Sequence, residues 1–292
     1  MNKHNLIYIT LFGVILLGFG QLTGDSTAFG LNLMGPPRSV LKEGQNAIGL
    51  EFGYNEMDLQ TFGDITEVQE LPLGAGTITT AGYTEYKIKK LQTTMLSIRL
   101  DTNIFEDWDL FIRFGATDGT DNIKEVLADD TTGHEYTDFD GNFGFSWGVG
   151  TRTTFYEQDN VTWGAIFQVN WANPGKSDIT DESDTNFTGE AEIKYWEFQL
   201  AIGPTIEYQN TLRIYGGPFI DFVKGDLDLC GSTVSPPLLS DTFSASHEIR
   251  EESQVGGFLG AQWNLGNNNT LITEAQLTDD AWGIGVSTSW KF

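Results

Sequence analysis

The stretch Trp282-Gly-Ile-Gly-Val-Ser-Thr-Ser-Trp-Lys-Phe292 decides the fold of this chain. Every second residue is apolar or compatible with lipid, and the residues between them are small or polar. A two-residue period is that of a β-strand with two unlike faces. An apolar edge strand left free in water promotes aggregation. We therefore expect this strand to pair with the first strand and close a barrel, with its apolar face turned to lipid.

The composition fits a membrane barrel and excludes several other classes. The chain has 292 residues, of which 39% are hydrophobic, as expected when strands carry one apolar and one polar face. The 34 glycines and the aromatic content of 13% suit bent strands and interface girdles. The 41 acidic residues against 16 basic ones give a net charge of -25, which argues against nucleic-acid binding. The single cysteine, Cys230, excludes an intrachain disulfide framework.

The N-terminal region reads as an export signal followed by a short connection. Residues 1–28 combine a basic start at Lys3, an apolar core over Leu6–Phe19 and a small-residue cleavage site ending at Ala28. The alternative for this region is an anchored N-terminal helix. Residues 29–44 contain Gly35-Pro-Pro37, and we expect them to form an extended periplasmic lead-in because proline cannot donate to a β-ladder. The barrel is expected over residues 45–292.

Alternation with a period of two returns throughout that region and predicts an all-β fold, a single antiparallel up-and-down transmembrane β-barrel of about ten strands. Misreading the seventh or ninth strand would leave eight, and a hairpin around Thr77–Lys87 would give twelve. The expected strands are Asn46–Asn55, Leu91–Thr102, a strand starting at Trp108, Asn142–Tyr156, Val161–Ala172, Glu192–Tyr208, Thr211–Lys224, Ser253–Leu265, Thr270–Leu277 and the C-terminal stretch.

The connections between these strands alternate in length. The connections after the second, fourth, sixth and eighth strands are short, whereas those after the first, third, fifth and seventh are long and polar. The last connection, Thr278–Ala281, is short where a long one would fit the pattern. Sorting of this kind is typical of a barrel with one end in the periplasm and the other outside the cell. Ten strands would also put both ends of the barrel domain on the periplasmic side.

Charged residues on the inward faces are the first candidates for function. Small barrels usually fill their interiors with side chains, and charges confined there must be paired or hydrated. The set is expected to form either a salt-bridged filling or a constriction that selects solutes by charge. Its members are Glu51, Arg99, Asp101, Asp109, Arg113, Arg152, Glu197, Glu207, Arg213, Asp221, Glu274 and Lys291.

The sequence gives weaker support for a catalytic or metal-binding role than for a charged lumen. Ten strands are also the strand count of the omptin proteases, which use Asp-Asp and Asp-His pairs near the outer rim. The two histidines after the signal, His134 and His247, lie in predicted long loops without a closely spaced Asp-x-His, so we assign no catalytic residue. Acidic loop positions can hold Ca²⁺, although no complete EF-hand is present; solvated loop charge is the alternative explanation. The metal candidates are Asp138, Asp140, Asp178 and Asp181.

Taken together, the export signal, the alternation, the loop sorting and the terminal Phe292 resemble small Gram-negative outer-membrane β-barrel proteins over residues 45–292. The resemblance implies an integral protein in contact with outer-membrane lipid and lipopolysaccharide, without cofactor. It also implies that the barrel-assembly machinery reads the C-terminal strand. We expect a narrow passive channel or a structural or surface-interaction barrel, with a rim hydrolase or a soluble secreted β-protein as alternatives. The residues of the assembly signal would be Trp282, Ile284, Val286, Trp290 and Phe292.

Overall fold

A computed structural model describes most of the chain after the signal region. The described residues are 32–71, 76–82, 85–126, 132–141, 143–181, 184, 186–208, 211–235, 239–251 and 254–292. The predicted signal, residues 1–28, lies outside them. Within the described residues, no helix has the length and apolar character needed to cross a membrane.

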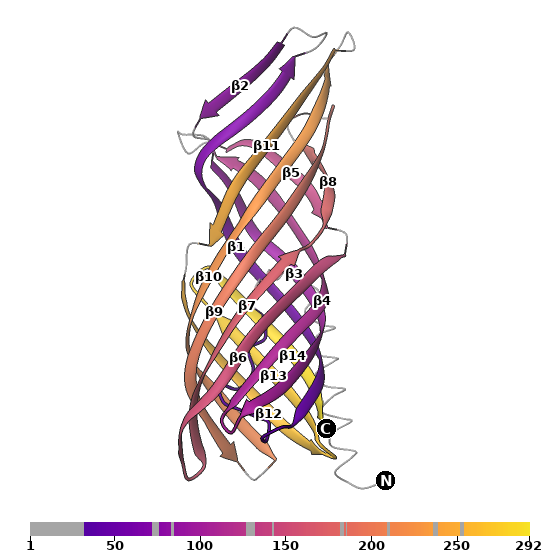
Figure 1. The fold of residues 1–292 in the computed structure, drawn as a ribbon. Helices are drawn as coiled ribbons and strands as arrows, with labels where there is room; N and C mark the ends of the chain where they lie inside the picture. The colour runs from indigo at the N-terminus through magenta and orange to yellow at the C-terminus, as the bar shows by residue number, and fades with distance from the viewer. Residues whose placement is uncertain are drawn as a thin grey trace.

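Ten antiparallel strands form a closed ring, as the sequence predicts (Figure 1). The ring closes where β14 pairs with β1 from Ala47 opposite Lys291 to Met57 opposite Ala281. We call this ten-stranded part the membrane ring. In order around the ring its strands are β1 (Asn46–Leu71), β3 (Glu85–Phe105), β4 (Trp108–Val126), β6 (Gly144–Gln158), β7 (Val161–Asn173), β9 (Phe187–Tyr208), β10 (Leu212–Ser235), β12 (Val255–Gly266), β13 (Asn269–Leu277) and β14 (Ala281–Lys291).

The outer surface of the membrane ring is apolar, and its interior is polar. Leu50, Ile98 and Leu200 are each at least 50% exposed, although each lies in the middle of a paired strand. Their sequence neighbours point inward and are small or polar. An exposed apolar band of this kind is unfavourable in water and matches the hydrocarbon core of a bilayer. The membrane ring is therefore a transmembrane β-barrel.

Tight turns join the strands at the end where the C-terminus lies (Figure 1). Asp159 joins β6 to β7 with a φ of 54°, and Asn267 and Asn268 join β12 to β13 with φ values of 50° and 64°. Asparagine and aspartate tolerate this left-handed region better than other non-glycine residues, which is why they occupy two-residue hairpin turns. These turns are the short connections that the sequence predicts.

The long connections are not the open loops expected from their polar composition, because much of their length continues the strands. β1, β3, β4, β9 and β10 run on past the apolar band. The additional strands are β2 (Gly76–Gly82), β5 (Thr132–Asp140), β8 (Lys176–Asp181) and β11 (Leu239–Glu251). Polar residues on the outward face are compatible with strands that lie in water. The prediction of loops was therefore wrong for these segments, because their polar composition is also compatible with strands in water.

These extensions close into a second ring of eight strands above the first. Its order is β1, β3, β4, β5, β8, β9, β10 and β11, and β11 returns to pair with β1 from Leu59 opposite Glu251 to Glu70 opposite Thr242. We call it the upper ring. The β13–β14 hairpin turns back at Thr278–Asp280 and does not reach this level. β6, β7 and β12 also belong to the membrane ring alone, so five of its strands are replaced by three others, β5, β8 and β11, and ten strands become eight.

The hairpin suggested by the sequence around Thr77–Lys87 does not add strands to the membrane ring. β2 pairs with the upper end of β1 only, from Ile65 opposite Gly82 to Leu71 opposite Gly76. The membrane ring keeps ten strands, so the alternatives of eight and twelve are wrong for it.

The interior of the upper ring is apolar, in contrast to the membrane ring beneath it. Inward-facing side chains meet at its centre, including the ring pair of Tyr136 and Phe187 at 5.4 Å between centroids. This core is as dry as that of a soluble domain, which explains how the ring can be stable outside the bilayer. Its buried members include Leu59, Tyr86, Ile88, Ile123, Tyr136, Phe187, Ile193, Leu227, Leu229 and Ile249.

Candidate functional site

The charges inside the membrane ring form one continuous ladder of ion pairs. Arg113 contacts Glu51 at 3.5 Å, and Glu51 in turn contacts Arg99 at 3.2 Å. The ladder continues through Asp101, which contacts Arg99 at 3.0 Å and Arg152 at 2.5 Å. It ends where Arg152 contacts Asp109 at 3.0 Å. All six of these side chains are buried, so each charge is compensated by a neighbour rather than by water.

An aromatic ring supports this ladder from within the lumen. The guanidinium carbon of Arg99 lies 3.7 Å from the centroid of the buried Phe111 ring. A cation above an aromatic face is favourable, the more so where water is excluded. The Phe111 ring therefore occupies part of the lumen that water would fill in an open channel.

The other predicted lumen charges differ in burial and in their partners. Glu207 and Arg213 pair with each other at 3.4 Å and are partly exposed. Lys291 donates to the backbone carbonyl of Val40 at 2.6 Å. Glu197, Asp221 and Glu274 are buried and are not members of the ladder.

Residues 32–44, which we call the lumen segment, lie inside the membrane ring. The sequence predicts an extended segment there, and the segment indeed forms no strand. Its position differs from a periplasmic lead-in, because Asn32, Leu33 and Met34 are buried among lumen side chains. Pro36 and Pro37 keep it from joining the ladder of a strand. Sequence periodicity carries no signal for a segment that is neither strand nor helix.

The upper half of the lumen segment is held by carboxylates and amides of the barrel. The two oxygens of Glu274 accept hydrogen bonds from the backbone N–H groups of Met34 and Gly35, each at 2.9 Å. Glu197 accepts from the backbone N–H of Asn32 at 3.2 Å and also from its side-chain amide. A carboxylate that accepts backbone N–H groups makes a strong, charge-assisted hydrogen bond. Two of the predicted lumen charges therefore bind a piece of the chain itself.

Further polar side chains of the barrel bind the same part of the lumen segment. Arg113 donates to the carbonyl of Leu33 at 2.8 Å. Gln168 and Gln276, which the sequence analysis did not single out, donate to the carbonyl of Asn32 at 3.1 and 2.9 Å. Their inward position on predicted strands was visible in the alternation, but nothing local indicated that they bind another segment.

The lower half of the lumen segment is fixed near the periplasmic end. Asp109 accepts from the hydroxyl of Ser39 at 2.8 Å and from the backbone N–H of Val40 at 2.7 Å. A Cβ on Gly164 would lie 2.1 Å from the carbonyl oxygen of Pro37, so only glycine permits the segment to approach that strand. The segment thus contacts the barrel from Asn32 to Val40.

Little space remains around the lumen segment. One small cavity beside Asn32 is lined by Asn55, Thr93 and Ser146 among others, and a second lies near Gly49 and Lys291. Each has room for about one water molecule. The described lumen segment and the inward side chains around it therefore fill much of the lumen.

The predicted metal and catalytic candidates are not brought together. Asp140 and Asp178 are exposed, and Asp181 is buried on β8; the side chain of Asp138 lies outside the described ones. Within the described ranges, no group of three or more His, Cys, Asp or Glu side chains is arranged to hold a metal ion. His247 is buried in the upper ring with its ring 4.7 Å from that of Tyr86, and the His134 side chain is also outside the described set.

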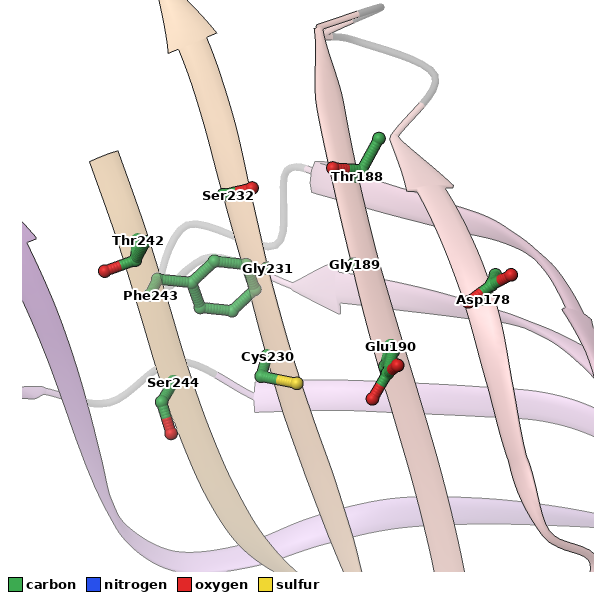
Figure 2. A pocket seen from close by; sticks show the side chains of 10 residues that line it. All are labelled: Asp178, Thr188, Gly189, Glu190, Cys230, Gly231, Ser232, Thr242, Phe243 and Ser244. Carbon is green, nitrogen blue, oxygen red and sulfur yellow. The ribbon is translucent and has the colours of Figure 1, made fainter. Parts of the chain in front are cut away.

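The outer face of the upper ring carries a shallow hollow across β8 to β11 (Figure 2). Outward side chains of Glu190 and Asp178 border it, with the exposed thiol of Cys230 and the hydroxyl of Ser232. It contains neither a histidine nor a basic group. This surface is acidic and open, and it offers no arrangement of a nucleophile with a base.

Several ion pairs lie on the outer face of the upper ring, just above the apolar band. Lys224 contacts Glu248 at 2.9 Å, and Lys194 contacts Glu192 at 3.0 Å. Hydrogen bonds from Lys224 and then Arg250 lower the pKa of Glu248, so this carboxylate stays ionised further into acid than an isolated one. The basic members of these pairs lie on the outward face, two residues beyond the exposed apolar side chains of Trp196 and Phe222.

Comparisons with known proteins find matches among solved structures alone. No protein-family model matches the chain, and no curated protein sequence matches it. Among solved structures, the chain is similar to the outer membrane protease OmpT from Escherichia coli, with 7% identity, a TM-score of 0.45, and coverage of 90% of this chain and 99% of that one. It is also similar to the translocator domain of the autotransporter NalP from Neisseria meningitidis, with 12% identity, a TM-score of 0.39, and coverage of 87% and 90%. The outer membrane protein OprG from Pseudomonas aeruginosa gives 12% identity, a TM-score of 0.38, and coverage of 86% and 97%.

These structures differ in activity, and their likeness to this chain is distant. The argument for a transmembrane barrel rests on the strand pairing and the apolar band of the chain itself.

Proposed function

We propose that this protein is a closed integral outer-membrane β-barrel that holds a rigid β-ring outside the cell and acts through that ring as a structural or surface-interaction protein. The observation that carries the proposal is the filled lumen. The lumen segment occupies the membrane ring, and an apolar core occupies the upper ring. A passive channel would need a continuous aqueous path through both.

The location follows from the outer surface of the membrane ring. Aliphatic and aromatic side chains form its exposed band, and a soluble secreted protein would aggregate through a patch of this size. Transmembrane barrels of this even-stranded kind belong to the outer membranes of Gram-negative bacteria. The soluble alternative is therefore disfavoured.

Conductance measurements in planar bilayers test the closed state. The purified mature protein is expected to insert without steady unit conductance, because both rings are filled. Heat-modifiable gel mobility of the same sample must show that the barrel is folded. Regular unit steps from folded protein would overturn the proposal and favour the narrow channel.

We propose no catalytic role for the barrel. His247 packs within the upper ring, where a substrate at the rim does not reach it. Peptide and ester hydrolysis by the folded protein should equal that of a His134→Ala, His247→Ala variant. A loss of measurable hydrolysis in the variant would restore the hydrolase alternative.

Two partners belong to this proposal. The basic residues Lys194, Lys224 and Arg250 lie above the apolar band and would contact lipopolysaccharide phosphates there. The exposed Trp290 and Phe292, with the partly exposed Trp282, Ile284 and Val286, form the outward face of the closing strand that the barrel-assembly machinery would read. Calcium bridging through the outer acidic side chains would be weak, since they are dispersed.

A further inference from the structure

The outward face of β10 changes its chemistry in a fixed order as the strand leaves the membrane ring. Ile220 and Phe222 are exposed apolar side chains, and Lys224 follows them on the same face. The next two outward positions are the acidic Asp226 and Asp228. One basic residue therefore separates the lipid-facing part of this strand from the acidic part above it.

The two strands that flank β10 in the upper ring repeat this order, although both run in the opposite direction. Toward the upper ring, the outward face of β9 carries the exposed Trp196, then Lys194, then Glu192. On β11 the basic Arg250 lies below the acidic Glu248 on the same face. Three adjacent strands thus each place a basic residue between the membrane ring and the acidic surface above it.

Strand register aligns some of these basic positions in one row across the barrel. Lys224 lies directly opposite Arg250, and Arg250 lies opposite Gln60 on β1. Gln60 in turn lies opposite Lys87 on β3. Neighbouring strands are about 4.8 Å apart, so these three steps span about 14 Å. The four positions, which all point outward between buried neighbours, form what we call the basic row: Lys87, Gln60, Arg250 and Lys224.

The basic row keeps a positive charge in a chain whose net charge is -25. Glu248 contacts Lys224 at 2.9 Å and also contacts Arg250, so it holds these two cations side by side. One carboxylate compensates only one of two cations, which leaves the three groups together positive. The side chains of Lys224 and Arg250 are 58% and 44% exposed, so a further anion can reach both.

The basic row has two cationic ends. Lys87 is one end, the pair of Arg250 and Lys224 is the other, and the neutral Gln60 lies between them. Lysine and arginine both make charge-assisted hydrogen bonds to phosphate. A headgroup with two separated phosphates matches both ends, whereas a phospholipid headgroup with one phosphate would engage only one of them. The lipid part of lipopolysaccharide is a disaccharide with a phosphate at each end.

We propose that the basic row binds the two phosphates of one lipopolysaccharide molecule, whose acyl chains lie against the exposed apolar side chains beneath it. Phe222 lies two residues below Lys224, and the exposed Phe198 lies opposite Phe222, so the apolar surface begins directly under the row. The site rests on the proposed function in one respect, because it needs the upper ring to lie outside the cell.

The site also has a fixed side of the barrel. The outward faces of β6, β7, β12, β13 and β14, all within the described residues, carry no lysine or arginine. An anionic lipid on that side would meet no cation above the apolar band. Bound lipopolysaccharide is therefore expected along β3, β1, β11 and β10.

Native mass spectrometry of the folded mature protein in detergent tests the inference, because it counts the lipids that stay bound. Three lipids are titrated separately: the bisphosphorylated lipid part of lipopolysaccharide, the same lipid after removal of both phosphates, and phosphatidylglycerol. We expect one molecule of the bisphosphorylated lipid to bind, and the other two lipids to bind at least about tenfold more weakly because they lose one or both phosphate contacts.

Variants of the basic row separate this site from general surface charge. Lys224→Ala combined with Arg250→Ala should weaken binding of the bisphosphorylated lipid at least about tenfold, because one cationic end is lost. Lys224→Arg should retain binding, since the charge is kept. Lys176→Ala is the matched control and should bind as the wild type does, because Lys176 is 62% exposed, also pairs with a glutamate, and lies on β8 outside the row. Heat-modifiable gel mobility must show that each variant is folded.

Equal binding of the dephosphorylated lipid would overturn the proposal. An equal loss in Lys176→Ala would do the same, since any surface cation would then suffice. If phosphatidylglycerol binds as tightly as the bisphosphorylated lipid, a phospholipid and not lipopolysaccharide occupies the row. Conductance of the same protein is measured separately, so a conducting barrel would contradict the closed state and leave the result for the basic row intact.

Discussion

Single residues decide how closely the lumen segment can approach the barrel. Gly285 on β14 faces inward, and a Cβ there would lie 2.6 Å from a terminal methyl group of Leu33. Its cross-strand partner on β1 is Gly53, where a Cβ would meet only the end of Met95 at 3.9 Å. The two glycines share a strand pair and differ in their contact with the segment, which makes them a matched pair for experiment.

Gly285→Val is expected to destabilise the folded protein by about 1–3 kcal/mol, the usual cost of overpacking. Leu33→Ala in the same chain should recover part of the loss because the collision is with that side chain. The measurement is the temperature at which gel mobility changes, combined with protease sensitivity of the lumen segment. Gly53→Ala is the control and should be nearly neutral. A loss in Gly285→Val that Leu33→Ala does not relieve would place the strain in the strand itself.

Individual strands serve two environments along their length. β10 carries Ile220 and Phe222 on its lipid-facing side, and beyond them the charged Lys224 on the same face. The inward face changes in the opposite sense, from a mixed face that carries Arg213 and Asp221 in the membrane ring to Leu227 and Leu229 in the upper ring. The inversion occurs because the dry side of the sheet moves from the outside of the barrel to its inside when the strand leaves the bilayer.

Ile249→Pro tests whether the upper ring is a separate element. Ile249 is fully buried on β11 and is paired on both sides, opposite Thr61 and Gly225. Proline removes a ladder donor and a core side chain, at a cost of about 3 kcal/mol or more. We expect proteolysis within β11 and normal heat-modifiable mobility of the membrane ring. Ile249→Val should behave as wild type; loss of the folded gel form in the proline variant would show that the rings fold as one unit.

In the whole molecule, the path through the barrel is blocked at two successive levels, the membrane ring and the upper ring. The lumen segment lies among buried side chains of the membrane ring, and an apolar core lies inside the upper ring. Either closure alone would block ions, since an apolar core excludes water and a hydrogen-bonded segment displaces it. The architecture therefore makes the barrel insensitive to the loss of one closure.

Deletion of residues 32–41 from the mature chain should leave the barrel electrically silent, because the upper ring remains packed. The same deletion combined with Ile249→Pro is expected to conduct, with regular unit steps in planar bilayers. Ile249→Pro alone is the control and should be silent. Conductance after the deletion alone would show that the upper core is not a seal.

From the sequence alone, the membrane-spanning parts of the strands, their two faces and a ring of about ten strands could be predicted, whereas loops are predicted where the upper ring has its strands. The correct predictions follow from a two-residue alternation, which is local and is imposed by the bilayer on every strand. It also identified the inward charges, since each lies in register with its own strand. It could not determine their partners, because ladder contacts such as Arg152 with Asp101 depend on which strands are neighbours.

Only the tertiary structure decided that the lumen is occupied and that the long connections form a second ring. The bonds of Asn32 to Glu197 and of Met34 to Glu274 join residues 165 and 240 positions apart, and the segment that makes them has no period of its own. The upper ring exists because β11 joins β10 to β1 above β12–β14, and β5 and β8 join β4 to β9 above β6 and β7. Long-range closure of this kind is a property of the whole sheet, and no single stretch of the chain encodes it.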